Sequence, residues 1–340
     1  MKCLPDKQNG RLLLIFCLCC LILTGCAGKE STNMLSAPDA AQRLTIYTSH
    51  KAEVYEPLIR EFERRTGIFV SVQTGGTNEM LEKIAAEADS PIADVMFGGG
   101  VESLEAYNQY FASCGTEAVF SPDYRLSSSL WTEFSSLPVV IIYNTHLVGL
   151  KEAPRGWADL LSGRFMGQIA LASPVVSGSS YTALYTMSQA LGLSADETVV
   201  KVCENLAGRA LSDSGETVGA VAAGHFQVGV TLEETARKGV AAGRDIAIVY
   251  PCEGTSAVPD GAAVIKGCAQ RENAGKFIAF ILGPDVQSRL NTEFFRRGVT
   301  GDLQDFGAAT EAFATIDYDV AGASAAKADV LKAWNREAGE

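Results

Sequence analysis

The fold class follows from residues 44–100, LTIYTSHKAEVYEPLIREFERRTGIFVSVQTGGTNEMLEKIAAEADSPIADVMFGGG. Short runs rich in β-branched and aromatic residues predict strands at 44–49, 68–73 and 92–97. Between the first two runs, Tyr55, Leu58, Ile59 and Phe62 share one helical face, and Gly67 ends the helix. A glycine turn then opens into a second predicted helix within 74–88. This β-α-β-α-β order is typical of a mainly parallel sheet covered by helices.

A second alternation of elements follows an apolar run at 137–145, LPVVIIYNT. This run is too short to cross a membrane, and we interpret it as a buried strand that passes from one lobe to another. Further strands are predicted within 167–173, 226–231, 247–251 and 262–267, and helices within 157–162, 181–191, 196–206, 214–224, 272–283 and 327–338. With 340 residues, of which 47% are apolar, the chain is long enough for two cores.

The first 26 residues have the pattern of a secretory leader. Three basic residues precede an apolar run from Leu12 to Leu23, which is shorter than a membrane-spanning helix of about 20 residues. Residues 23–26, LTGC, resemble the lipobox of bacterial lipoproteins, in which the cysteine carries the lipid and becomes the first mature residue. We therefore expect lipidation at Cys26, a flexible tether at 27–43, and a protein anchored outside the cytoplasmic membrane.

Charge and cysteine usage narrow the function classes. The leader carries a net charge of +2 and the whole chain −12, so residues 26–340 carry −14, which argues against a nucleic-acid partner. Of nine cysteines, only Cys114, Cys203, Cys252 and Cys268 lie beyond the leader and the lipidation site. The sequence leaves open a disulfide between Cys252 and Cys268, which a pair of strands would bring together. Their spacing does not support a zinc site.

Five turns rich in glycine and hydroxyl residues lie where predicted strands end or helices begin: YTSHK, TGGTN, FGGGVE, SPVVSGSSYT and SDSGET. Ligands of open α/β sheets bind beyond the carboxyl ends of the strands. Glycine allows the backbone to approach a ligand, and free N–H groups at helix starts bind anions. Each turn alone is commonly no more than a turn or a helix cap. Together they predict a cradle for a phosphate, phosphonate or carboxylate.

Catalytic motifs are weak in this chain. TGGTNEM lacks the Lys-Ser/Thr ending of a P-loop, and SGSSYT lacks the spacing of a nucleophile elbow. His50 follows the first strand, where it could contact a ligand, whereas His146 and His225 are predicted to be surface or capping residues. We therefore expect a binding protein rather than an enzyme, with a periplasmic phosphatase or a ligand-sensing module as the alternatives from other classes.

The stretches 46–72 and 74–100, together with WADLL, FMGQIALASP, SGSSYT, VYPCEGT and ENAGKFIAFILG, resemble the type II extracellular solute-binding proteins of ABC importers. The resemblance is to the branch that binds ferric iron, thiamine, 2-aminoethylphosphonate and hexose phosphates. It extends over nearly all residues from Leu44 onward. It implies an α/β fold of two lobes joined by two crossover strands, with residues 44–139 and 256–310 in lobe 1 and residues 140–255 and 311–340 in lobe 2.

The resemblance also implies how a solute is held. We expect a solute with two ends, an anionic head and a hydroxyl or amine end. The residues expected at the head are Ser49, Gly76, Thr77, Gly99, Gly100, Ser179, Ser180 and Tyr181. The residues expected at the other end are Glu233, Glu234 and Glu253, and His50 and Thr231 are further candidate contacts.

The ligand is a phosphorylated sugar or a phosphonate in this interpretation, with thiamine or ferric iron as alternatives. His50 and Lys51 match a histidine and lysine of the iron-binding members, but Glu233 and Glu234 stand where those members carry two tyrosines. Thiamine would need aromatic stacking, for which the candidates are Tyr143, Tyr181, Tyr185 and Phe97. We expect a monomer that needs no cofactor or resident metal and delivers its solute to ABC permease subunits.

Overall fold

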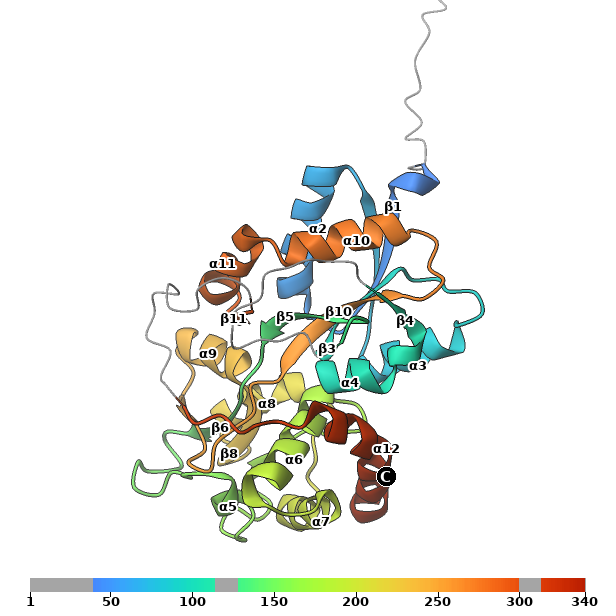
Figure 1. Cartoon of the computed structure of the whole chain (residues 1–340). Coiled ribbons are helices and arrows are strands. Elements are labelled where there is room, and N and C mark those ends of the chain that lie inside the picture. Colours follow the sequence, from blue (N-terminus) through green and yellow to red (C-terminus); the bar gives the residue numbers. More distant parts are fainter. Residues whose placement is uncertain (1–38, 114–127, 300–312, 340) are drawn as a thin grey trace, which may run out of the picture. The chain divides into compact units, whose positions relative to one another are not determined.

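The computed structural model describes residues 39–113, 128–299 and 313–339. In these residues the strands form two sheets, each flanked by helices (Figure 1). None of the helices in the described ranges has both the length and the apolar character that a membrane crossing needs. The predicted leader, the expected lipidation site Cys26, most of the predicted tether and Cys114 lie outside the described residues. The end of the predicted tether, 40–43, forms a 3₁₀ turn at Ala40–Gln42 and the start of the first strand.

The first sheet has seven strands in the order β11-β5-β10-β3-β1-β2, with β4 paired to β10. Its strands are β1 (Arg43–Thr48), β2 (Phe69–Thr74), β3 (Val95–Gly100), β4 (Phe111–Ala112), β5 (Thr132–Ser136), β10 (Pro259–Ile265) and β11 (Arg297–Gly298). Its helices are α2 (Ala52–Thr66), α3 (Thr77–Ala86), α4 (Val101–Ala106), α10 (Arg271–Ile281) and α11 (Pro284–Glu293), and a 3₁₀ turn lies at Asn108–Tyr110. We call this sheet with these helices the first lobe.

The second sheet has four strands in the order β7-β8-β6-β9. Its strands are β6 (Val139–Asn144), β7 (Ile169–Ala170), β8 (Val228–Leu232) and β9 (Ile246–Val249). Its helices are α5 (Trp157–Leu160), α6 (Gly178–Leu191), α7 (Ala195–Leu206), α8 (Thr217–Ala222), α9 (Glu233–Ala241) and α12 (Val320–Ala338), with a 3₁₀ turn at Ser214–Glu216. We call this group the second lobe.

Among the described residues, two segments lead from a strand of one sheet to a strand of the other, from β5 to β6 and from β9 to β10. These two segments run side by side, because the Leu137 N–H donates to the Val258 carbonyl at 3.1 Å and the Val139 N–H donates to the Ser256 carbonyl at 3.3 Å. The two-lobed α/β fold with two crossover segments is therefore confirmed. The residue numbers that the sequence suggests as lobe boundaries stay a prediction.

The direction of the strands differs from the mainly parallel sheets that the sequence predicted. Parallel pairing is found for β1 with β2, β1 with β3 and β7 with β8. The strand β10 pairs antiparallel with β3, β4 and β5, and β6 pairs antiparallel with β8 and β9. Both sheets are mixed because each receives a strand next to a crossover, and such a strand enters from the opposite end of the sheet.

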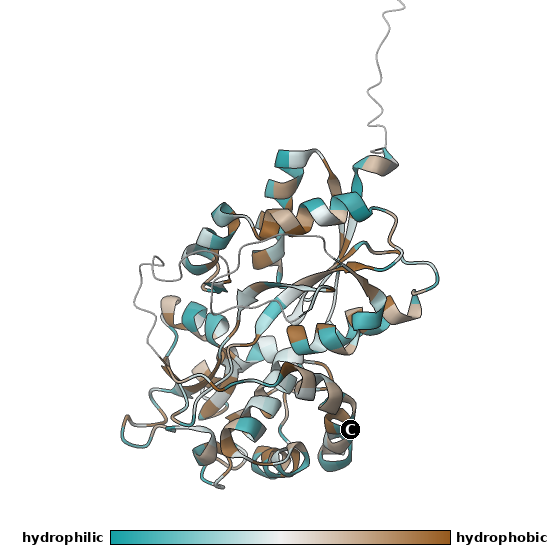
Figure 2. Ribbon diagram, viewed as in Figure 1, coloured by the Kyte–Doolittle hydropathy of each residue, from teal (hydrophilic) through white to brown (hydrophobic). Residues whose placement is uncertain are grey.

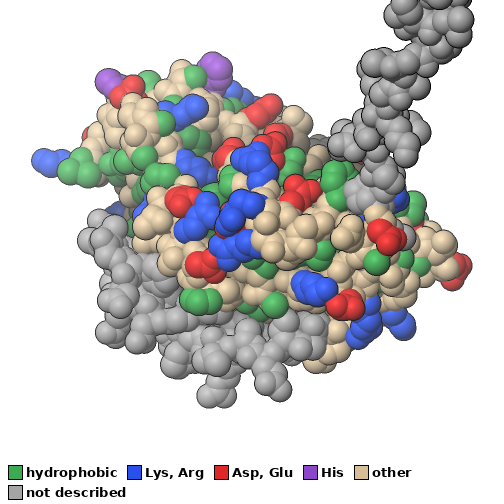
Figure 3. Space-filling view, turned by 90° about the horizontal axis from the view of Figure 1, so that it is seen from above, with side chains coloured by type: hydrophobic (Ala, Val, Ile, Leu, Met, Phe, Trp, Pro, Cys, Tyr) green, Lys and Arg blue, Asp and Glu red, His purple; other side chains and the backbone are tan. Residues whose placement is uncertain are grey.

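The helix α2 shows how local sequence builds the first lobe. Val54, Leu58, Ile59 and Phe62 are its buried residues, and Gly67 ends it in the left-handed conformation with φ of 70°. This face packs on the strands of the first sheet within one core cluster that also includes residues of α10 and α11. Hydrophilic residues cover the outer faces of α2 and α11 (Figure 2). Seen from above, Lys, Arg, Asp and Glu side chains are interspersed on this side of the molecule (Figure 3).

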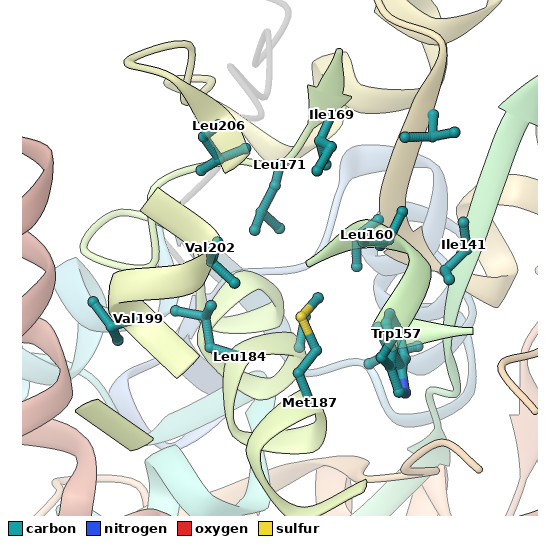
Figure 4. Close-up of a cluster of buried hydrophobic side chains, with 14 of the residues drawn as sticks. Ile141, Trp157, Leu160, Ile169, Leu171, Leu184, Met187, Val199, Val202 and Leu206 are labelled. Atoms are coloured by element: carbon teal, nitrogen blue, oxygen red, sulfur yellow. The ribbon is translucent and has the colours of Figure 1, made fainter. Parts of the chain in front are cut away.

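A separate apolar cluster forms the core of the second lobe. Trp157 from α5, Leu184 and Met187 from α6, and Val199 and Val202 from α7 lie within it (Figure 4). The α12 residues Ala323, Val330, Ala333 and Trp334 join the same cluster. The two lobes therefore have separate hydrophobic cores.

The disulfide that the sequence left open is absent, because Cys252 and Cys268 are both free. Cys252 follows β9 in the second sheet, and Cys268 follows β10 in the first. The strand pair that would have brought the two thiols together does not exist.

Candidate functional site

A cavity of about 690 Å³ lies between the two lobes. That volume falls within the range of small-molecule binding sites. The turns that lead into α2, α3, α4, α6 and α9 all contribute to its wall, together with the loop at 212–214. Of the predicted site residues, those that line the cavity are Ser49, His50, Gly76, Thr77, Gly99, Gly100, Ser179, Thr231 and Glu234.

The turn after β1 is held in place by Thr48. Its hydroxyl donates to the Phe97 carbonyl of β3 at 2.6 Å and accepts from the His50 N–H at 3.1 Å. The His50 ring is buried and meets Phe97 edge to face at a centroid distance of 4.3 Å. Burial, and then the positive charges of Arg296 and Lys238, lower the pKa of His50 well below its usual value. His50 is therefore a neutral imidazole at neutral pH.

Two glycines let backbone and side chains crowd together beside α3. Gly99 has φ of 90°, a conformation that L-residues rarely adopt, and a Cβ there would lie 2.6 Å from Cγ2 of Thr77. On the other side of Thr77, a Cβ on Gly178 of the second lobe would lie 3.2 Å from the Thr77 hydroxyl oxygen. The Thr77 side chain thus lies between backbone of both lobes, at the start of α3.

The start of α6 presents hydroxyl groups from the second lobe. Ser177 is the N-cap, and its hydroxyl oxygen accepts from the Ser180 N–H at 3.3 Å and lies 3.1 Å from the hydroxyl of Ser179. Ser177, Gly178 and Ser179 all line the cavity. The first N–H groups of a helix lack intrahelical partners and bind anions, and because Ser177 accepts from those of Ser180 and Tyr181, the N–H groups of Gly178 and Ser179 are the candidates here.

Two residues predicted from this turn, Ser180 and Tyr181, do not line the main cavity. Ser180 is buried behind Ser179, and Tyr181 is fully buried in the second core, where its hydroxyl donates to the Ala323 carbonyl. Burial raises the pKa of Tyr181, so its phenol stays protonated. Neither residue lines this cavity, because α6 begins at Gly178 and the side chains that follow in its first turn are buried.

A network of buried charged groups forms the floor of the cavity. Arg296 donates from Nη1 to Asp260 Oδ2 at 2.6 Å and from Nε to Glu234 Oε2 at 3.2 Å. Asp260 Oδ1 also accepts two hydrogen bonds from Ser135, one from its backbone N–H at 2.9 Å and one from its side-chain hydroxyl at 2.6 Å. Lys238 lies 3.0 Å from Glu234 Oε2. Each buried charge therefore has a partner of opposite sign.

The same network joins the two lobes. Glu234 and Lys238 belong to α9 of the second lobe, whereas Asp260 and Arg296 belong to the first. Burial tends to raise the pKa of Glu234, but the charges of Arg296 and Lys238 outweigh it and hold that pKa below its usual value. Glu234 thus stays ionised and neutralised in place.

The other two glutamates expected at the solute are engaged elsewhere. Glu233 is buried and accepts from Arg297 Nε at 2.8 Å and Nη2 at 2.7 Å, and from the Tyr250 hydroxyl. Glu253 accepts from the Trp157 and Ala158 N–H groups at 3.1 and 3.0 Å and so caps α5. Neither glutamate lines the cavity. The guanidinium of Arg297 holds the carboxylate of Glu233, and free N–H groups at the start of α5 hold that of Glu253.

The aromatic residues proposed to stack on thiamine also lie outside the cavity wall. Phe97 is in the core of the first lobe, and Tyr143 and Tyr181 are in the core of the second. Tyr185 stacks on Tyr181 with ring centroids 6.3 Å apart. None of the four belongs to the residues that line the cavity.

Several cavity residues were missed by the sequence reasoning. Asn78, Ser177 and Asp213 lie in the turns TGGTN, SPVVSGSSYT and SDSGET, so their neighbours pointed to them. No motif in the sequence pointed to Asp260 or Arg296. Asp260 lies within the strand β10, and Arg296 follows the helix α11, which was not predicted from the sequence. Among the described residues, no group of three or more His, Cys, Asp or Glu side chains is arranged to hold a metal ion.

Residues 91–319 match the family model described as bacterial extracellular solute-binding protein. The chain belongs to this family. The resemblance seen in the sequence is therefore confirmed, and the family is one of extracytoplasmic binding proteins rather than enzymes.

Two curated relatives cover most of this solute-binding protein. A candidate 2-aminoethylphosphonate-binding periplasmic protein of Salmonella typhi is 26% identical, over 76% of this chain and 79% of that protein. Iron uptake protein A1 of Synechocystis is 23% identical over 79% of both chains.

A solved structure shows the same fold as this solute-binding protein. It is the periplasmic binding protein AfuA of Actinobacillus pleuropneumoniae with fructose 6-phosphate bound, which superposes with a TM-score of 0.76 at 23% identity. The match covers 87% of this chain and 98% of that one. The two-lobed architecture is thus shared along almost the whole of the neighbour's length.

Proposed function

We propose that this protein captures a small anionic solute, a phosphorylated sugar or a phosphonate, and delivers it to an ABC permease. The observation that carries the proposal is the convergence of hydroxyl- and glycine-rich turns from both lobes on one cavity of about 690 Å³. Named ligands of its relatives, 2-aminoethylphosphonate and fructose 6-phosphate, belong to the same chemical class.

The anionic head would lie between the starts of α3 and α6. Thr77 approaches from the first lobe, and Ser177 and Ser179 approach from the second. Hydroxyl donors and free N–H groups at helix starts suit phosphate or phosphonate oxygens without a dedicated cation. Among the described residues that line the cavity, Arg296 carries a guanidinium already paired with Asp260 and Glu234, and Lys51 carries an ammonium group that is also available to an anion.

The other end of the solute would carry hydroxyl or amine groups. Glu234 remains a candidate partner, because it lines the cavity, whereas Glu233 and Glu253 do not. A solute with one anionic head and one neutral or cationic end fits this arrangement better than a dianion with charge at both ends.

In this mechanism the two lobes close around the solute, and the solute undergoes no chemical reaction. A solute that touches both lobes favours the closed form by its higher affinity for that form. The cross-lobe contacts of Thr77 with Gly178, and of Glu234 with Arg296, are the kind of contact that closure makes. Several charge-assisted hydrogen bonds in such a site support micromolar affinity, about 8 kcal/mol.

A calorimetric and thermal-shift panel tests the proposed ligand class. The panel contains fructose 6-phosphate, glucose 6-phosphate, 2-aminoethylphosphonate, thiamine and ferric citrate. We expect a phosphorylated sugar or the phosphonate to raise the melting temperature and to bind at micromolar concentration or below. Binding of thiamine or ferric citrate alone would overturn the proposal, and steady hydrolysis of a phosphate ester would favour an enzyme.

We also propose that Cys26 carries a lipid that anchors the protein to the membrane. The support is the order of basic start, apolar run and LTGC at residues 23–26. A Cys26→Ser variant should lose metabolic labelling by palmitate and leave the membrane fraction. Cys252→Ser, which changes a free exposed thiol, is the matched control and should stay labelled. Equal labelling of both variants would contradict the anchor.

A further inference from the structure

Asn78 connects the starts of α3 and α6 across the cavity. It is the second residue of α3 in the first lobe, and its Nδ2 donates to the Val175 carbonyl of the second lobe at 2.9 Å. Val175 lies two residues before Ser177, the N-cap of α6. The Asn78 side chain is 9% exposed and lines the cavity. The contact therefore forms only while the two lobes are close together.

The close approach of the lobes at this point is visible in two glycines. A Cβ on Gly76 would lie 3.1 Å from the Val176 carbonyl oxygen, and a Cβ on Gly178 would lie 3.2 Å from the Thr77 hydroxyl oxygen. Each glycine is in one lobe and its neighbour is in the other. The Asn78 bond is thus part of a small interface in which glycine backbone of each lobe lies close to the other lobe.

The orientation of the Asn78 amide is fixed by this contact. A backbone carbonyl accepts hydrogen bonds and cannot donate them, so the amide nitrogen must face Val175. The amide oxygen then faces away from Val175. Asn78 Oδ1 is buried and has no hydrogen-bond partner among the described residues. A buried acceptor left without a donor costs about 1–3 kcal/mol, so a donor from the cavity contents is strongly favoured there.

We infer that Asn78 is a specificity-determining residue, whose Oδ1 accepts a hydrogen bond from a hydroxyl or amine of the solute while its Nδ2 holds the lobes together. The inference rests on the proposed function, because it concerns the non-anionic end of the same solute. It replaces the role that the sequence gave to Glu233 and Glu253. One amide thereby links recognition of the solute to closure of the lobes.

The Asn78 amide oxygen should determine which solutes the protein prefers. An amide oxygen accepts from a hydroxyl or an ammonium group and offers nothing to an alkyl chain. A site with an unpaired acceptor discriminates strongly against an analogue that lacks the matching donor. The protein should therefore prefer 2-aminoethylphosphonate or fructose 6-phosphate to ethylphosphonate, which has the anionic head and no donor at its other end.

The test compares these three probes on the wild type, Asn78→Ala, Asn78→Asp and Gly76→Ala by calorimetry, with competition for weak binders. Asn78→Ala should weaken the donor-bearing probes about tenfold more than ethylphosphonate, because it removes the acceptor. Asn78→Asp keeps an acceptor but cannot donate to Val175, so it should weaken all probes while it retains the preference for 2-aminoethylphosphonate.

The variant Gly76→Ala is the matched control for closure alone. Its methyl group meets the Val176 carbonyl but leaves the Asn78 amide in place, so all three probes should weaken by the same factor. Circular dichroism and melting temperature confirm that each variant is folded. If Asn78→Ala does not fold, Asn78→Ser takes its place with the same expectation.

Two failures are distinguishable in this design. Wild-type protein that binds the probes, with an affinity ratio that Asn78→Ala leaves unchanged, would overturn the inference and leave the proposed function standing. Wild-type protein that binds neither these three probes nor glucose 6-phosphate would overturn the proposed function, and the inference with it.

Discussion

Arg296 Nη1 lies 2.6 Å from Asp260 Oδ2, and both side chains are almost completely buried beneath the cavity between the lobes. The residue before Arg296 is Phe295, which has φ of 59°, a conformation that is unusual for a bulky residue. This turn lets Arg296 reach the floor while Arg297 turns to Glu233. Two consecutive arginines thereby hold two consecutive glutamates of α9 in the opposite lobe.

Replacing Arg296 with leucine tests how much this pairing matters. The substitution leaves the Asp260 carboxylate buried without its guanidinium partner, and the loss of one partner of a buried pair costs about 3–5 kcal/mol. We expect the free energy of unfolding, measured with urea, to fall by about that amount. Arg60→Ala is the control, because Arg60 forms an exposed pair with Glu56 one helical turn away. Equal stability of Arg296→Leu and wild type would contradict a structural role for the network.

The sequence predicted the turns around the cavity because of one geometric rule. The carboxyl ends of β1 and β3, which are parallel neighbours, lie at one edge of the first sheet, so Ser49 and Gly99 had to be close. The same local patterns located Thr77 and Ser179 at helix starts. These predictions need only the order of strands and helices and the chemistry of turn residues.

The residues that the sequence missed depend on long-range pairing. Asp260 reaches the floor because β10 enters the first sheet antiparallel between β3 and β5. Arg296 arrives through α11 and β11, and neither element has a periodicity strong enough to be predicted. Glu233 and Glu234 are adjacent on a helix and about 100° apart around its axis, so they could not both face the solute. No pattern in the sequence tells which of the two does.

Ser179 and Ser180 form a natural pair for testing the anion site. Ser179 lines the cavity beside Ser177, whereas Ser180 lies behind it. We expect Ser179→Ala to weaken binding of fructose 6-phosphate or 2-aminoethylphosphonate about tenfold, through the loss of one charge-assisted hydrogen bond. Ser180→Ala should bind as the wild type does. Calorimetry in which the two variants behave alike would remove Ser179 from the site.

Gly178 offers a test of lobe closure that removes no hydrogen-bonding side chain. Its Cβ would lie 3.2 Å from the Thr77 hydroxyl oxygen across the cleft. Gly178→Ala should therefore weaken every solute that closes the lobes, by roughly tenfold, without lowering the melting temperature of the free protein. The measurement is calorimetry with whichever of the two solutes binds the wild type.

The matched control for Gly178 is Gly275, which lies inside α10 with no atom within 4 Å of an added Cβ. Gly275→Ala should leave affinity unchanged and stabilise the fold by about 0.5–1 kcal/mol, because alanine is the better helix former. Unchanged affinity in Gly178→Ala as well would show that the lobes do not meet there in the bound form.

Because Glu133 on β5 is buried, we expect the free energy of unfolding to depend on pH. Glu133 is 5% exposed, and within the described part of the chain its Oε2 has no hydrogen-bond partner. Burial raises the pKa of Glu133 from 4.5 to about 7. The folded protein therefore binds a proton that the unfolded chain releases above its pKa of 4.5. This contribution to the free energy of unfolding is fully present below pH 4.5 and is lost as the pH rises through 7.

Glu133→Gln removes the titrating group and keeps its shape, so its stability should not decline over this window. We expect the variant to gain on the wild type between pH 4.5 and 7 by on the order of 3 kcal/mol, the value of a shift of that size. Urea unfolding at pH 5, 6, 7 and 8 measures the difference. Glu56→Gln, an exposed control on α2, should parallel the wild type throughout. A constant gap between Glu133→Gln and the wild type from pH 5 to 8 would mean that Glu133 is already ionised in the folded state.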